Sequence, residues 1–122
     1  MIRKLSLRPL HVALNSLLKK YGIKLSDKNF PFVNIDIPGI FNNDTKTFKG
    51  DEVLVFFTIV DDSNTNIRLY EIAEKITEAL EEGLTVQDFT CEISRNSNSG
   101  VQEEENYRTL RLGYNFKLTQ IN

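Results

Sequence analysis

The chain has 122 residues, 40% of them hydrophobic and 26% charged, a composition typical of a folded domain rather than a disordered segment. Residues 1–30 carry seven lysines or arginines and one acid, whereas residues 31–122 carry eight against sixteen acids. The one cysteine excludes an intramolecular disulfide, and no stretch approaches the ~20 apolar residues that cross a bilayer. We therefore expect one domain over residues 1–122, made in the cytoplasm and without membrane contact.

The first predicted element is a helix between Pro9 and Gly22. Residues 1–8 are too short and too charged for a signal peptide, and we expect them to be flexible. Pro9 suits the first turn of a helix, and Gly22 is a typical stop. Between them, apolar residues recur at the spacing of one helical face. They are Leu10, Leu14, Leu17, Leu18 and Tyr21.

Two predicted strands follow this helix. Residues 33–37 alternate between apolar and polar side chains, which indicates a half-exposed strand, and Pro38–Gly39 ends it. Residues 42–51 are polar and rich in turn-forming residues, and residues 45–48 among them are a candidate short strand. Residues 53–60 are apolar at seven of eight positions, so both faces of this strand are apolar. Helices of a short chain can cover one face, and the other calls for more chain or another subunit.

The second half of the chain predicts a helix and two further strands. Asn64 or Asn66 is the expected cap of a helix that ends at Gly83. Alternation over residues 89–93 and again over 110–118 indicates strands. Residues 95–106 are too polar to build a core, so we expect a mobile loop. The order predicts an α+β fold in which two helices cover one face of a mainly antiparallel sheet of four to five strands.

Catalytic constellations are absent from the sequence. His11 is the only histidine and has no carboxylate near it, which favours a structural or surface role over general base catalysis. Cys91 lies on an alternating strand and is expected to point into the core. One cysteine and one histidine are too few for a zinc site, and a turn explains Asp61 and Asp62 better than a metal does. We expect no enzyme activity, no catalytic or metal-binding residue, no cofactor and no small-molecule substrate.

The order of these elements resembles the tail terminator family of long-tailed bacteriophages, also called tail completion or tail-to-head joining proteins. The resemblance covers residues 8–119. It rests on the helix LHVALNSLLKKYGI, the strand opened by PFVNIDI, the segment DTKTFKGDEV, the strand LVFFTIV, the helix IRLYEIAEKITEAL and the final YRTLRLGYNFKL. The chain departs from many relatives in lacking a tryptophan in the long strand.

This resemblance implies a protein that catalyses nothing, uses no cofactor and assembles into a ring, commonly a hexamer. In the family, the ring caps the tail tube at its final length and docks the tail onto the head connector. The implied partners are further copies of the chain, the major tail tube protein and the head–tail connector protein. The implied location is the head–tail interface of the virion, after assembly in the host cytoplasm.

Two sets of residues are candidates for these contacts. The loops predicted to dock onto the tube or connector contain Asp44, Lys46, Lys49, Asp51, Arg95, Asn98, Glu103, Glu104 and Glu105. The candidate face between subunits contains Phe56 and Arg111, whereas Arg108 is expected on the opposite face of the same strand. The unequal charges of the two parts of the chain favour head-to-tail contacts around a ring.

Two other functions remain open from the sequence. A stopper or adaptor protein of the head–tail connector has a similar size and also forms rings. A small nucleic-acid-binding module that uses the basic amino-terminal section is the second alternative. It predicts binding to DNA or RNA that falls steeply with salt.

Overall fold

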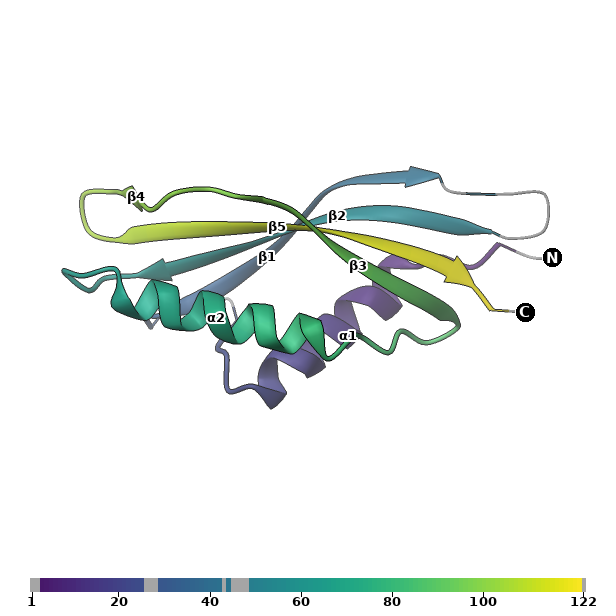
Figure 1. The fold of residues 1–122 in the computed structure, drawn as a ribbon, viewed down its shortest axis with the longest axis horizontal. Helices are drawn as coiled ribbons and strands as arrows, with labels where there is room; N and C mark the ends of the chain where they lie inside the picture. Colours follow the sequence, from purple (N-terminus) through teal and green to yellow (C-terminus); the bar gives the residue numbers. More distant parts are fainter. Residues whose placement is uncertain (1–2, 26–28, 43, 45–48, 122) are drawn as a thin grey trace.

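The computed structural model describes residues 3–25, 29–42, 44 and 49–121. In these residues the elements are α1 (Leu7–Lys20), β1 (Phe32–Asn42), β2 (Gly50–Asp61), α2 (Ile67–Glu81), β3 (Phe89–Asn98), β4 (Gln102–Glu103) and β5 (Arg108–Gln120). The strands form one antiparallel sheet in the order β1-β2-β5-β3, and β4 pairs with the start of β5. Both helices lie on the same side of the sheet (Figure 1). The predicted α+β fold is confirmed.

The core lies between the two helices and the central strands β2 and β5. On β2 the odd-numbered side chains point to the helices, and Val53, Val55, Phe57 and Ile59 are all 0% exposed. The antiparallel register places Phe57 opposite Leu112 of β5, so two apolar rows meet on one face. The helices add Leu10, Leu14, Leu18, Leu69, Ile76 and Ala79 to this core. Removal of apolar surface from water stabilises it by about 25 cal/mol per Å².

The amino-terminal segment is anchored where flexibility was expected. α1 begins at Leu7, ahead of Pro9, and Ser6 before it is buried. Pro9 lies in the first turn, where a missing N–H removes no helical hydrogen bond. Arg3 and Ser6 both donate hydrogen bonds to Asp51 at the start of β2. Residues 3–6 are therefore tied to the sheet by polar contacts that a sequence pattern does not show.

The strand predicted over residues 89–93 extends beyond the residues that alternate between apolar and polar side chains. β3 runs to Asn98, and Ser97 and Asn98 still pair with β5 after a bulge that follows Arg95. A backbone ladder needs no apolar side chains on an edge strand, because its outward groups are solvated. The prediction of a loop over residues 95–106 is therefore wrong for 95–98 and for the short strand β4.

Two local predictions have different outcomes. Asn66 immediately precedes α2 but makes no side-chain capping hydrogen bond. Its Oδ1 instead accepts a hydrogen bond from Nη1 of Arg108 at 2.6 Å, which joins the helix start to β5. The candidate short strand over 45–48, with the candidate residue Lys46, lies outside the described residues.

Candidate functional site

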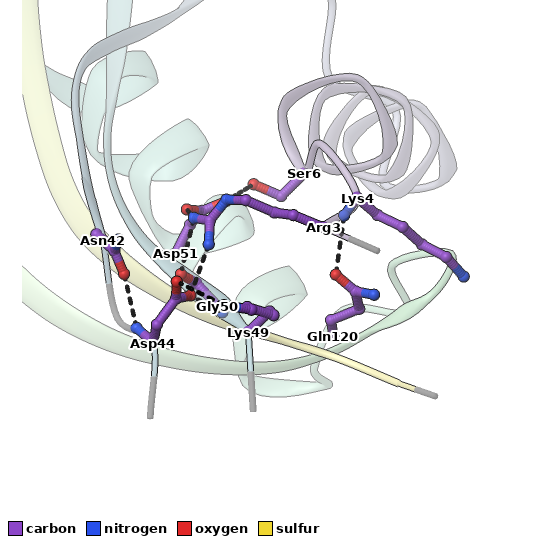
Figure 2. Close-up of polar contacts among 9 residues, drawn as sticks. All are labelled: Arg3, Lys4, Ser6, Asn42, Asp44, Lys49, Gly50, Asp51 and Gln120. Carbon is purple, nitrogen blue, oxygen red and sulfur yellow. Dashed lines mark hydrogen bonds and ion pairs between the residues drawn. The ribbon is translucent and has the colours of Figure 1, made fainter. Parts of the chain in front are cut away.

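Three of the predicted docking residues, Asp44, Lys49 and Asp51, lie close together where the β1–β2 hairpin approaches the segment before α1 (Figure 2). Asp51 is 8% exposed, and both of its carboxylate oxygens accept hydrogen bonds. Nη2 of Arg3 lies 2.5 Å from Oδ1, and Oγ of Ser6 lies 2.7 Å from Oδ2. The buried carboxylate is thus paired with a cation and fully hydrogen-bonded, which is the condition for burying a charge without a large penalty.

Asp44 completes this group, which we call the hairpin cluster: Arg3, Ser6, Asp44, Lys49 and Asp51. Its Oδ1 accepts hydrogen bonds from the backbone N–H of Gly50 at 2.9 Å and from Nη1 of Arg3 at 2.6 Å. Nζ of Lys49 lies 3.6 Å from its Oδ2. These contacts, the Gly50 hydrogen bond foremost, lower the pKa of Asp44 below its usual 3.8. The cluster holds the loop end of the β1–β2 hairpin to the amino-terminal segment.

The lowered pKa of Asp44 gives a testable pH dependence. A carboxyl whose pKa is depressed by folding adds stability above its unfolded pKa, and that stability is lost as the pH falls through the folded pKa. We expect Asp44→Asn to be less stable than the wild type from about pH 5 upward, and this difference to shrink as the pH falls below 3.8 toward the lowered pKa of Asp44. Urea unfolding at each pH measures this difference.

The matched control is Asp36→Asn, which changes an exposed aspartate of β1 outside the hairpin cluster. A stability difference between Asp44→Asn and the wild type that stays constant down to about pH 3 would show that ionised Asp44 does not stabilise the fold.

Phe56 and Arg111, the two residues of the candidate face between subunits, are in contact on the outer face of the sheet. Phe56 pairs in register with Gly113, and a Cβ at Gly113 would lie 2.9 Å from Cε1 of the ring. The ring therefore rests in space that only glycine leaves. The guanidinium carbon of Arg111 lies 5.1 Å from the ring centroid, within cation–π range. Phe56 is half-buried by these contacts, and Arg111 is exposed.

The remaining candidates lie away from the hairpin cluster. Asp51 pairs with Leu118, whereas Asp61 at the other end of β2 pairs with Arg108, so Arg108 lies at the opposite end of the sheet. Glu103 forms an ion pair with Nη1 of Arg108 at 3.1 Å there. The other candidates on β3 and in the turn after β4 are exposed: Arg95, Asn98, Glu104 and Glu105. The structure thus places Asp44, Lys49 and Asp51 at one end of the sheet and the turn over residues 103–105 at the other, whereas Arg95, opposite Tyr114 in the middle of β5, lies between them.

An ion pair between the buried Asp61 and the partly exposed Arg68 joins β2 to α2, and the sequence did not predict it. The side chain of Asp61 is 0% exposed, and Arg68 meets it in a two-pronged contact: Nε lies 3.0 Å from Oδ2 and Nη2 lies 2.5 Å from Oδ1. Nη2 also lies 3.1 Å from Oδ1 of the exposed Asp62. The turn interpretation of the two aspartates identified their place but not this partner. Asp61 ends β2, and Arg68 lies seven positions later in α2. The two residues therefore do not share a helix, and no helical spacing in the sequence predicts their contact.

The residue types that most often carry chemistry are dispersed. Cys91 is half-buried, and burial raises its pKa to about 11, so its thiol stays protonated and weakly nucleophilic at neutral pH. His11 is exposed on α1. Within the described ranges, no three His, Cys, Asp or Glu side chains are arranged to hold a metal ion. None of the helices in that part of the chain is long and apolar enough to cross a membrane.

Comparisons with known proteins give a match in structure but none in sequence. No family model matches the chain, and no curated protein matches it. The structure does match a chain of a solved structure described as "Virion of native gene transfer agent (GTA) particle", with a TM-score of 0.79 and 11% identity. The two chains share a fold. The match covers 96% of this chain and 99% of the other.

Proposed function

We propose that this chain is a structural component of a phage-like virion. The observation that carries the proposal is the fold shared, over nearly the full length of both chains, with a chain of a gene transfer agent virion. The order of sequence elements that resembles tail terminators points in the same direction. Within the virion, we assign the chain to the completed end of the tail tube, where a ring of copies joins the tail to the head connector.

The two separated groups of polar residues suit a protein held between two neighbours. The hairpin cluster ends one side of the sheet, and the acidic turn with Glu103, Glu104 and Glu105 ends the other. A ring subunit between tube and connector needs a docking surface at each end. The ion pairs at the loop end of the β1–β2 hairpin would hold that surface in place and so reduce the ordering cost of assembly.

The outer face around Phe56 and Arg111 remains the proposed contact between copies. Its apolar area is limited, because Phe56 is half-buried between Gly113 and the Arg111 guanidinium. A stable interface needs roughly 800 Å² from each partner, so this face alone is insufficient and further surface must contribute.

The deciding experiment is electron microscopy of particles assembled without this chain. We expect tails that are unattached to heads and irregular in length, because the growing tube is neither capped nor joined. Restoring the chain in trans is the control and should return attached tails of uniform length. Normal, head-attached tails in its absence would overturn the proposal.

A stopper or adaptor in the connector remains the alternative within the same class, and localisation of the chain in particles separates the two. A terminator lies on the tube, whereas a stopper or adaptor lies on the head side of it. The nucleic-acid-binding alternative is weakened by intramolecular pairing of the basic section. Arg3, Lys4 and Lys20 are engaged with Asp44 and Asp51, with Asp88 and with Glu82, respectively.

A further inference from the structure

The first two turns of α1 form an exposed ridge. We call Leu7, Arg8, His11 and Val12 the α1 ridge; Leu7 is 42% and Val12 55% exposed, and the other two are exposed as well. Open hollows of about 650 and 660 Å³ flank it, and Arg8 and Val12 line both. Val12 therefore lies at the border of both. Exposed apolar side chains gathered beside a cation are typical of a protein contact surface.

An open groove of about 620 Å³ lies between α2 and β3. Its apolar lining includes Tyr70, Ala73, Leu110 and Leu112. Three glutamates of α2, Glu74, Glu78 and Glu81, line it as well, together with one cation, Arg95 of β3. We call this surface the α2–β3 groove. Its apolar lining can receive the apolar side chains of the α1 ridge, and its glutamates are opposite in charge to Arg8.

The two surfaces lie at opposite edges of the molecule. The hollow beside the ridge is lined by Ile37 and Ile40 of β1, one edge strand, whereas the groove borders β3, the other edge strand. A ridge and a groove at opposite edges cannot meet within one copy, but they can meet between successive copies. Contacts of this kind are head-to-tail and close into a ring when the rotation between copies allows.

We propose that the α1 ridge of one copy seats in the α2–β3 groove of the next copy. An apolar helical face in an apolar groove is a recurrent mode of recognition. Arg8 then faces the glutamates of α2, so the electrostatic attraction has the right sign. The inference rests on the proposed function in one respect, because the proposed ring needs a head-to-tail contact. It names the further surfaces that this contact requires besides the outer face around Phe56 and Arg111.

The edge strands themselves are poorly suited to joining copies by extending the sheet. The backbone N–H of Val33 in β1 already bonds to the carbonyl of Lys24 at 2.9 Å, and Leu25 pairs with Val33. Further along, the β1–β2 register shifts between Asp36 and Gly39, where Pro38 lies. β3 carries its own bulge after Arg95. Bulges and prolines blunt edge strands, so side chains rather than backbone ladders are expected to join the copies.

The test uses two single variants of the full chain, Val12→Asp on the ridge and Tyr70→Asp at the groove. Both positions are exposed, so folding should be retained, as circular dichroism will show. Sedimentation velocity up to millimolar concentration should give oligomers for the wild type and monomers for each variant. An equimolar mixture of the two variants should give dimers and nothing larger, because it restores one intact ridge and one intact groove per pair.

Arg8→Glu should weaken association about tenfold or more, whereas Lys19→Glu on the same helix should leave it nearly unchanged.

Three results would each overturn the inference: a wild type that stays monomeric, a folded variant that associates like the wild type, or a mixture that remains monomeric. Its failure is distinguishable from failure of the proposed function. If copies do not associate through these surfaces but particles lacking the chain still have unattached tails, only the inference is wrong. If copies associate as proposed but such particles are normal, only the proposed function is wrong.

Discussion

Replacing Phe57 with alanine is expected to cost about 3–5 kcal/mol of folding free energy. Its ring is 0% exposed and packs edge-on against Tyr114, with ring centroids 6.0 Å apart. Truncation removes apolar contacts and leaves a cavity that the helices and sheet cannot close completely. Because small domains are stable by only about 5–15 kcal/mol, this one change takes a large share of the total. Chemical denaturation followed by circular dichroism measures it.

The matched control is Phe56→Ala, the adjacent residue on the other face of β2. Only part of the Phe56 ring leaves water on folding, so we expect a loss of about 1–2 kcal/mol. Equal losses at the two positions would mean that the outer face is as important to the monomer as the core. A small loss at Phe56 together with impaired assembly would assign that face to contacts between copies.

The sequence predicted the core well because periodicity records which side chains face inward. Alternation along residues 110–118 and helical spacing from Leu10 to Leu18 both matched the buried residues. The apolar run over residues 53–60 also revealed two apolar faces, and the structure explains the second. Phe56 covers Gly113 and Arg111 covers Phe56, so part of the apolar surface on the outer face is buried by the chain itself.

The candidate sites were harder to predict because polar partners are chosen by tertiary structure. Asp51 and Arg3 are separated by 48 positions, and no local pattern links them. The strand character of Ser97 and Asn98 was likewise hidden, because pairing with β5 rather than side-chain polarity decides it. A charge imbalance between the two parts of the chain was visible in composition. Only the fold shows which of these charges pair in the hairpin cluster and which lie on the α1 ridge and in the α2–β3 groove.

The second large effect is expected at the ion pair between the buried Asp61 of β2 and Arg68 of α2. Arg68→Met keeps much of the side-chain stem but removes the cation, and the carboxylate of Asp61 then stays buried without its partner. Loss of one member of a buried pair costs about 3–5 kcal/mol, and the partial exposure of Arg68 reduces this to about 2–3 kcal/mol. Thermal or urea unfolding at neutral pH measures the loss.

A double-mutant cycle separates the pair from its surroundings. The double variant, Arg68→Met with Asp61→Asn, removes both charges, so it should be less destabilised than the sum of the single changes predicts. Asp62→Asn is the control, since Asp62 is 52% exposed and its contact with Arg68 should contribute less than about 0.5 kcal/mol. Additive losses in the cycle would show that Asp61 and Arg68 stabilise the fold independently. The start of α2 would then be held by its apolar contacts and by Asn66 with Arg108.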